Sequence, residues 1–481
     1  MSNTYENFID GKWTSSGKYY DIHNPADYDE IIGRFPLSEP RDTDAAVLAA
    51  HKAFLTWSRL LPMERAQYVE RFVALLDEKT NYLGECLCME QGKPLAEAVG
   101  EPSRGVKECR YVIGEATRLQ GISLPSERQG VTNTVVREPI GVVAAITPWN
   151  FPLLTPLRKM IPALVAGCTV VLKPSSDTPW CSVLLLELIE KAGFPSGVVN
   201  LIIGRGSEIG DTLCGNPLVR GITFTGSTVV GRRINKIGAE HFVKVQLEMG
   251  GKNPAIVYDY ADIKTAAKSI AAAAFANAGQ RCTAVSRVLV KRQQAEELEQ
   301  AIVAICKEYK LGPGLEKGTT IGPVVNKKAG DSIMGYIQKA REQGAYIAVG
   351  GNRLSGGVYD KGFYIEPTLI TGVTADMSVA REEIFGPVLT VQRVDSFEEA
   401  LEVANSSEYG LASCVFTDIQ ANIYTFMRES QSGMVHINHG SVSESFMPFG
   451  GIKMSGLGPF SIGTTNKDFF TNLKVIYNQY I

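Results

Sequence analysis

The sequence lacks long apolar runs and any strong excess of charge. No uninterrupted apolar run is long enough to span a bilayer. The opening residues, MSNTYENFIDGKW, contain no basic region followed by an apolar stretch, so we expect no secretory signal. The formal net charge is -3 and the basic residues are scattered along the chain. We therefore expect neither a membrane nor a nucleic acid as a partner.

Cysteine pairs of the CxxC type are also missing, although the chain contains nine cysteines. The two that lie closest together, Cys86 and Cys88, fall in a predicted helix, where residues i and i+2 point apart. This pattern favours buried, reduced thiols in a cytoplasmic protein. We expect no bound metal.

The composition is typical of globular proteins, with 44% hydrophobic and 21% charged residues. A length of 481 residues predicts two or three domains. Helical patterns at 41–59, 63–79 and 94–117 are followed by apolar, β-rich runs that alternate with helices. Such alternation indicates a parallel sheet covered on both faces. The strands are predicted at 141–146, 169–173, 198–203, 221–225 and 243–248, and the helices at 154–166, 178–192, 207–214 and 228–240.

A second alternating unit begins at Asn253 and continues to about residue 445. After its first strand, Asp262 is placed to cap a helix that runs to about Ala278, with Gly279 at the C′ position. Strand 286–291 follows. The fold class is therefore α/β, with two sheet-containing units.

Two polar, β-prone segments, 119–139 and 462–481, fit neither unit. They are free to pair with each other or with a partner subunit.

Cys282 ends the phrase NAGQRC, on a turn that leads from the predicted helix into a strand. A thiol there can face a cleft, and the adjacent Arg281 would favour the thiolate. An inert structural cysteine is the alternative, and on local pattern alone it is the more common case.

Two other residues lie where strands of the first unit end. Glu248 precedes MGGKNP, and a carboxylate buried at a strand end can act as a base. Asn150, in TPWNFPL, can donate its amide to a developing oxyanion. The alternatives are a strand-end salt bridge for Glu248 and an Asx-turn before Pro152 for Asn150.

Lys173 ends the strand in VVLKPSS and can contact ribose hydroxyls or a phosphate, or can simply be solvated. Gly226 and Ser227 follow another strand and can present N–H groups to a pyrophosphate at a helix N-terminus. The GxGxxG fingerprint is absent. Since ligands bind beyond the carboxyl ends of parallel strands, these groups, together with Glu248 and Asn150, predict one crevice.

The sequence resembles the aldehyde dehydrogenase superfamily over nearly its full length. TPWNFP, VVLKPS, FTGST, LEMGGKNP, GQRC, EEIFGP and PFGGIKMSG occur in the family's order and at its spacings. The resemblance implies that Cys282 is the nucleophile, Glu248 the general base and Asn150 the oxyanion donor.

The resemblance also implies a fold, a cofactor and an assembly. A Rossmann-type dinucleotide-binding domain would comprise 1–118 and 140–249, an α/β catalytic domain 250–449, and a β oligomerisation arm with tail 119–139 and 462–481. A homo-oligomer, a dimer or tetramer, is expected. The cofactor is expected to be NAD or NADP, contacted by Ile146, Thr147, Pro148, Trp149, Lys173, Ser175, Ser176, Gly226, Ser227, Met249, Glu383 and Phe385.

Single positions bear on the choice of cofactor and substrate. Relatives that prefer NAD often carry glutamate where this chain has Ser176, so we expect NADP to be accepted. Arg158 falls where succinate-semialdehyde dehydrogenases bind the substrate carboxylate, whereas Ala276 replaces their second arginine. The expected substrate is an anionic semialdehyde: succinate semialdehyde, 2-oxoglutarate semialdehyde or sulfolactaldehyde. Further candidates for its binding are Asn150, Arg281, His439 and Ser443.

Two alternatives to a hydrolytic dehydrogenase remain open. An acylating relative would pass the acyl group to coenzyme A, although the methylmalonate-semialdehyde branch lacks the glutamate found here at Glu248. A non-catalytic protein of the same fold is the other alternative, and it would not need to keep Cys282, Glu248 and Asn150.

Overall fold

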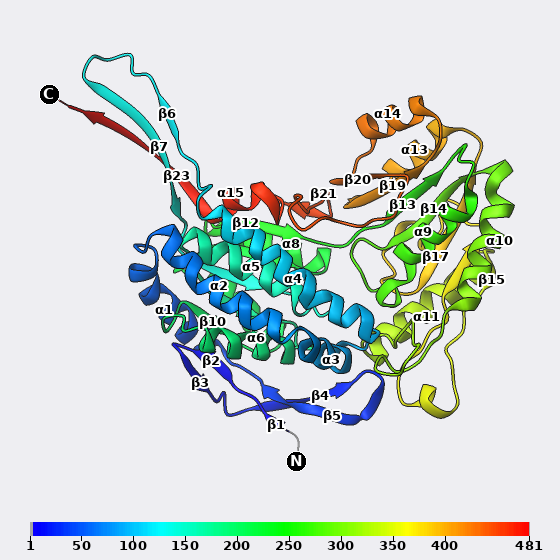
Figure 1. The fold of residues 1–481 in the computed structure, drawn as a ribbon. Helices are drawn as coiled ribbons and strands as arrows, with labels where there is room; N and C mark the ends of the chain where they lie inside the picture. Colours follow the sequence, from blue (N-terminus) through cyan, green and yellow to red (C-terminus); the bar gives the residue numbers. More distant parts are fainter. Residues whose placement is uncertain (1–2, 481) are drawn as a thin grey trace.

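The computed structural model describes residues 3–480 (Figure 1). The chain opens with short strands and then forms four long helices. The strands are β1 (Asn3–Thr4), β2 (Asn7–Ile9), β3 (Lys12–Thr14), β4 (Tyr19–Asn24) and β5 (Asp27–Pro36), and the helices are α1 (Pro40–Trp57), α2 (Pro62–Glu78), α3 (Thr80–Gln91) and α4 (Leu95–Glu115). No helix within residues 3–480 has both the length and the apolarity needed to cross a membrane.

An eight-stranded sheet forms the first unit, in the order β22-β12-β11-β8-β9-β10-β2-β3. Its strands are β8 (Val142–Ile146), β9 (Thr169–Lys173), β10 (Val199–Leu201), β11 (Val219–Thr225), β12 (Lys244–Glu248) and β22 (Gly456–Leu457), beside β2 and β3. The predicted parallel arrangement is confirmed for the five central strands. The edge strands β2, β3 and β22 run antiparallel, and the alternating pattern gave no sign of them because they come from distant parts of the chain.

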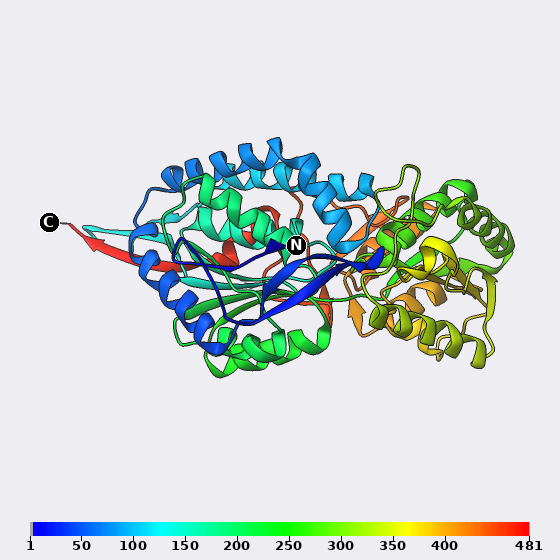
Figure 2. The same ribbon diagram turned by 90° about the horizontal axis from the view of Figure 1, so that it is seen from below.

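Helices cover both faces of this sheet (Figure 2). One face packs against α2, α3, α4, α5 (Leu154–Ala166) and α6 (Trp180–Lys191). The other packs against α1, α7 (Gly206–Gly215) and α8 (Thr228–Glu240). Strands β8, β9 and β10 are buried throughout, as expected for strands covered on both sides.

A seven-stranded sheet forms the second unit, in the order β15-β16-β17-β14-β13-β19-β20. All neighbouring pairs are parallel except β15 with β16. The strands are β13 (Asn253–Val257), β14 (Val285–Lys291), β15 (Tyr346–Val349), β16 (Thr368–Thr371), β17 (Val388–Val394), β19 (Ala412–Phe416) and β20 (Met434–Ile437). The helices are α9 (Ile263–Phe275), α10 (Arg292–Glu308), α11 (Lys327–Glu342), α12 (Ser378–Arg381), α13 (Phe397–Asn405) and α14 (Gln420–Glu429).

Of the two alternatives left open for the β-prone segments, pairing with each other is the one found in the structure. Strand β23 (Thr471–Gln479) pairs antiparallel with β7 (Val131–Pro139), and β6 (Ile122–Leu124) completes a three-stranded sheet. This arm extends away from the body of the molecule (Figure 1). The short helix α15 (Asn466–Phe470) and the two-stranded pair β18 (Tyr409–Gly410) with β21 (Ile452–Lys453) complete the fold.

The helix before the nucleophile candidate ends earlier than predicted. Asp262 caps α9 as expected, with its side chain accepting from the Thr265 N–H. The α-helix stops at Phe275, however, and a 3-10 turn with φ of 53° at both Asn277 and Ala278 replaces its last turn. Both residues are non-glycine residues in the left-handed region, where the backbone is strained, and no pattern in the sequence predicts this conformation.

Candidate active site

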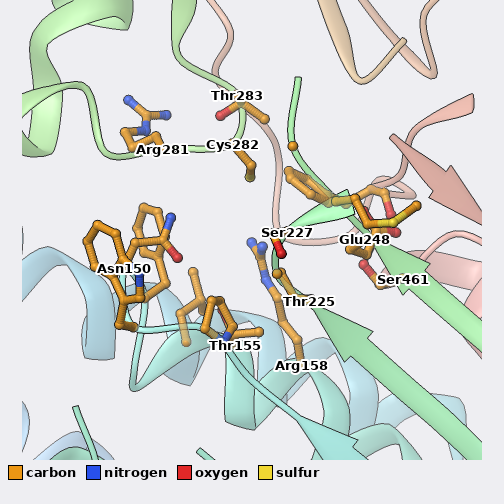
Figure 3. A pocket seen from close by; sticks show the side chains of 18 of the residues that line it. Asn150, Thr155, Arg158, Thr225, Ser227, Glu248, Arg281, Cys282, Thr283 and Ser461 are labelled. Carbon is orange, nitrogen blue, oxygen red and sulfur yellow. Dashed lines mark hydrogen bonds between the residues drawn. The ribbon is translucent and has the colours of Figure 1, made fainter. Parts of the chain in front are cut away.

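A cavity of about 280 Å³ lies between the two large sheets, where the carboxyl ends of β8, β11 and β12 face the loop that precedes β14 (Figure 3). It brings together most of the predicted site residues. The predicted residues that line it are Pro148, Trp149, Asn150, Arg158, Gly226, Ser227, Glu248, Met249, Arg281, Cys282, Glu383, Phe385 and Ser443.

The Cys282 loop is fixed by side chains from β13 and from the loop that follows β20. Asn253 Nδ2 donates to the carbonyls of Cys282 and Ala284, each at 2.8 Å, and Asn253 Oδ1 accepts from the Ala412 N–H at 3.0 Å. Ser441 Oγ donates to the Thr283 carbonyl at 2.6 Å. These bonds hold the backbone from Cys282 to Ala284, and the Cys282 sulfur points into the cavity (Figure 3).

Cys282 differs from the other cysteines in exposure. All nine are free, and it alone is not fully buried. Burial, together with the carboxylates of Glu248 and Glu383, raises the pKa of its thiol to about 11, while the positive charges of Arg281 and Arg158 oppose the rise. The thiol is therefore mostly protonated at neutral pH, and forming the thiolate requires a base or a nearby positive charge.

Asn150 lies beside the same loop. Its Nδ2 donates to the Gln280 carbonyl at 3.0 Å, which leaves the second amide hydrogen for an oxyanion. The backbone carbonyl of Asn150 accepts from Lys93 Nζ at 2.9 Å, and Lys93 forms an ion pair with Glu101 at 2.7 Å. Glu101 also accepts the N–H groups of Leu153 and of the next residue, at the start of α5. A buried ion pair thus connects α4, α5 and the Asn150 loop.

Glu248 ends β12 and is 5% exposed. Among the residues that the structure describes, its Oε2 has no hydrogen-bond partner. Burial raises the pKa of its carboxyl to about 8, and the positive charges of Lys159 and Arg158 oppose the shift. Lys159 donates to Thr223 Oγ1 at 3.0 Å, and burial lowers its pKa to about 7. A carboxylate with a pKa of this size is suited to take a proton near neutral pH.

The cavity also fits the nicotinamide half of a dinucleotide. Ser227 caps α8, so the first N–H groups of that helix face the cavity wall at Gly226 and Ser227. Glu383 accepts from the Gly251 N–H at 3.1 Å, and a Cβ at Gly250 would lie 2.0 Å from its carboxylate. Only glycine allows that approach. Trp149 and Phe385 form an edge-to-face aromatic pair at 5.4 Å on the wall, and the buried Thr147 Oγ1 has no partner within residues 3–480.

The residues predicted for the adenosine half lie outside the cavity. Lys173 is buried with its Nζ on the Pro174 carbonyl at 3.1 Å, and burial lowers its pKa to about 8. The Ser176 carbonyl accepts from the Tyr20 hydroxyl at 3.0 Å. Arg205, which precedes α7, lies close enough for its charge to lower the pKa of Tyr20 against the effect of burial. The sequence interpretation missed Arg205. Ile146 and Ser175 likewise lie outside the cavity.

The wall opposite the cofactor residues carries two arginines. Arg158 donates to both oxygens of Glu108, each at 2.7 Å, and its guanidinium lies 5.1 Å from the centre of the Phe449 ring. Arg104 donates to Glu108 at 2.8 Å and to Ser443 Oγ at 2.9 Å. The sequence interpretation missed Arg104 and Glu108. Their spacing of four residues on one helix was the available signal.

His439 does not reach the cavity. Its ring is exposed, and its Nδ1 forms a hydrogen bond of 2.7 Å with the Gly440 carbonyl. The backbone turns at Asn438, where φ is 56°, and directs the imidazole toward His436 at 5.0 Å between ring centres. The structure therefore does not support its predicted contact with substrate.

A doubly covered parallel sheet whose strand ends meet a thiol, a buried carboxylate and an amide defines a dinucleotide-dependent oxidoreductase that works through a cysteine. Comparisons identify which one. The model of the aldehyde dehydrogenase family matches residues 13–476, and the chain belongs to this family. The resemblance seen in the motifs is confirmed, and the chain is an NAD(P)-dependent enzyme that oxidises aldehydes.

Relatives and solved structures cover almost the whole chain. The alpha-ketoglutaric semialdehyde dehydrogenase of Bacillus subtilis (strain 168) is 40% identical, over 99% of this chain and 98% of its own. The 3-sulfolactaldehyde dehydrogenase of Pseudomonas putida is 41% identical, over 94% and 92%. The betaine aldehyde dehydrogenase of Staphylococcus aureus, solved with NAD+, superposes with a TM-score of 0.96 at 35% identity, over 99% and 95%. The α/β fold predicted from the sequence is confirmed.

Proposed function

We propose that this enzyme oxidises a semialdehyde with a terminal anionic group to the corresponding acid. The observation that carries the proposal is Arg158, a positive charge fixed on the wall of the cavity that also contains Cys282. Its pairing with Glu108 and its contact with Phe449 hold the guanidinium in one orientation, which suits recognition of a planar carboxylate. The relatives named for alpha-ketoglutaric semialdehyde and 3-sulfolactaldehyde, and those named for succinate semialdehyde, support this substrate class.

In the proposed mechanism, Cys282 forms and later breaks a covalent bond to the substrate. The Cys282 sulfur, as thiolate, attacks the aldehyde carbon, and the carbonyl oxygen becomes an oxyanion. The Asn150 amide and the Cys282 N–H donate to that oxygen. The nicotinamide dinucleotide that the cavity fits would supply a hydride acceptor, and loss of hydride from the thiohemiacetal would leave Cys282 as a thioester. Glu248 then takes a proton from water, the hydroxide adds to the thioester, and the acid departs while the thiol is restored.

We propose water, rather than coenzyme A, as the acceptor of the acyl group. The Glu248 carboxyl, whose Oε2 has no hydrogen-bond partner within residues 3–480 and whose pKa is about 8, supports this choice because it can activate water inside the cavity. Adding coenzyme A to the assay should give no acyl-coenzyme A product and leave the rate unchanged. Formation of that product would favour the acylating alternative.

We propose that NADP is accepted as well as NAD. Ser176 places no negative charge beside the adenosine ribose, and Arg205 adds a positive charge nearby. The two cofactors are compared by kcat/KM with a saturating aldehyde. A preference for NAD above a hundredfold, about 2.7 kcal/mol, would contradict the proposal.

We propose a homo-oligomer, a dimer or tetramer, in the cytoplasm. The β6-β7-β23 arm supports assembly because β23 is exposed along nearly all of its length away from the body. The nine free thiols fit a reducing compartment. Light scattering coupled to size-exclusion chromatography, on the full chain and on a chain that ends before Thr471, tests the role of the arm.

The substrate proposal is tested with Arg158→Gln. Succinate semialdehyde and butanal share a four-carbon chain and differ in the terminal anion. A lost charge-assisted contact of about 1.5–3 kcal/mol lowers the ratio of their kcat/KM values by roughly ten- to a hundredfold. An unchanged ratio in a folded variant would refute the anionic class. Absence of oxidation with every aldehyde tested, by a folded enzyme that binds dinucleotide, would favour a non-catalytic protein.

A further inference from the structure

We infer that Arg104 is a second anion-binding residue and that, together with Arg158, it selects the terminal group of the substrate. The inference rests on the proposed anionic substrate and extends it to a residue on another helix. Arg104 lies on α4, whereas Arg158 lies on α5, and both line the cavity. The ligand class is an aldehyde of short chain with a terminal oxyanion, either a carboxylate or a sulfonate.

The two arginines share one counter-charge. Glu108 Oε1 accepts from Arg104 Nε at 2.8 Å and from Arg158 Nη2 at 2.7 Å, and its Oε2 accepts from Arg158 Nε at 2.7 Å. One carboxylate therefore faces two guanidinium groups, and the cluster keeps a net charge of +1. The Glu108 side chain is 5% exposed, so water reaches the shared carboxylate very little.

Each of the two arginines keeps one guanidinium nitrogen, Nη1, without a protein acceptor among the described residues. Ser443 Oγ accepts from Arg104 Nη2 at 2.9 Å, so its own hydrogen is left to donate. An oxyanion between these groups would meet two guanidinium N–H donors and one hydroxyl.

The two positive charges also lie close enough to affect each other. Burial and the charge of Arg158 lower the pKa of Arg104, while the Glu108 carboxylate opposes this shift. A second positive charge held on a cavity wall against such repulsion is stabilised when an anion binds. Arg104 thus supplies the second anchor that Ala276 does not provide.

The two arginines differ in depth. The Arg158 side chain is 14% exposed and its charge lowers the pKa of Cys282, which places it deeper, toward the nucleophile. The Arg104 side chain is 30% exposed and bonds Ser443, which places it at the outer end. The terminal group of a four- or five-carbon semialdehyde would lie between them while its aldehyde carbon meets Cys282.

The test compares Arg104→Gln with a matched control on the same helix. Arg110 also lies on α4, pairs with Asp77 at the surface and does not line the cavity, so Arg110→Gln is the control. Arg104→Gln should lower the ratio of kcat/KM for succinate semialdehyde over butanal by about tenfold or more, mainly through KM for the anion. Arg110→Gln should keep the wild-type ratio. The ratio for Arg104→Lys should lie between those of wild type and Arg104→Gln, because lysine retains the positive charge but lacks the planar pair of guanidinium donors.

The outcomes separate this inference from the proposed function. If Arg158→Gln lowers the ratio but Arg104→Gln leaves it within about threefold of wild type, the role of Arg104 is overturned and the substrate class stands. If neither variant changes it, both proposals fail. Repeating the series with 3-sulfolactaldehyde distinguishes a sulfonate from a carboxylate. If Arg104→Gln does not fold, Arg104→Lys is used instead, and glutarate is tested as an inhibitor of butanal oxidation. The Ki of glutarate should be higher for Arg104→Lys than for wild type, and an equal Ki would overturn the inference.

Discussion

Replacement of Glu248 by glutamine tests the hydrolytic half of the reaction. The variant keeps the shape of the side chain but removes the base, so the thioester on Cys282 should form and then persist. A single rapid burst of reduced cofactor, equal to the number of active sites, should be followed by a steady rate at least a hundredfold slower, which is the low end of the effect of a general base.

The wild-type pH profile gives the magnitude. With a pKa of about 8, roughly a tenth of Glu248 is deprotonated at pH 7, half at pH 8 and nine-tenths at pH 9. Thioester hydrolysis should therefore rise about tenfold between pH 7 and pH 9. Because the positive charge of Arg158 lowers the pKa of Glu248 and persists at pH 8, Arg158→Gln should move the midpoint above 8.

Stopped-flow absorbance of the reduced cofactor measures both phases, at saturating aldehyde and across pH 6–10. A Glu248→Gln enzyme that turns over steadily at the wild-type rate would refute the assignment of the base. A wild-type steady rate that is flat from pH 6 to pH 9, under conditions where hydrolysis limits turnover, would refute the raised pKa. Isolation of the acyl-enzyme by mass spectrometry distinguishes slow hydrolysis from slow attack.

Three further predictions follow from charged side chains. Lys93→Met leaves Glu101 charged and unpaired, so the free energy of unfolding in urea should fall by about 3–5 kcal/mol. The value of kcat should also drop, because the Asn150 loop loses its hydrogen bond to Lys93. Adding Glu101→Gln to the same chain should restore part of the stability. Arg205→Ala should lower kcat/KM for NADP about tenfold relative to NAD, measured with one aldehyde; equal losses would exclude a phosphate contact. Finally, the raised pKa of Glu248 means that its neutral form stabilises the fold fully below about pH 4.5, and that this stability is lost as the pH rises through 8. The melting temperature of Glu248→Gln should therefore lie above that of wild type at pH 9 and equal it at pH 4.

Much of the fold could be predicted because its central strands are buried on both faces and therefore read as unbroken apolar runs. The helices α5 and α8 and the strand β9 have the predicted bounds. The sheet edges could not be predicted this way. Strands β2, β3 and β22 are short and come from the chain ends, so their partners are set by long-range contacts rather than by local pattern.

The candidate site likewise contains residues that could be predicted from the sequence and a backbone feature that could not. Cys282, Glu248 and Asn150 could be found because each stands at a turn next to a strong pattern, and the family motifs then gave their roles. The strained backbone before Gly279 could not be found, because positive φ at Asn277 and Ala278 is imposed by packing and not by residue type.

Helix α4 explains why the substrate side of the site escaped the sequence interpretation. Glu101, Arg104 and Glu108 stand at positions i, i+3 and i+7, so they share one helical face. Charged residues at that spacing usually form a solvated surface, but here the face packs on α5, and a Cβ at Gly105 would lie 2.5 Å from the Leu157 side chain. Glu101 then fixes the Asn150 loop while Glu108 fixes both arginines. The same helix face therefore positions the oxyanion donor and the anion-binding groups, and a shift of α4 would change the reaction rate and the substrate selectivity together.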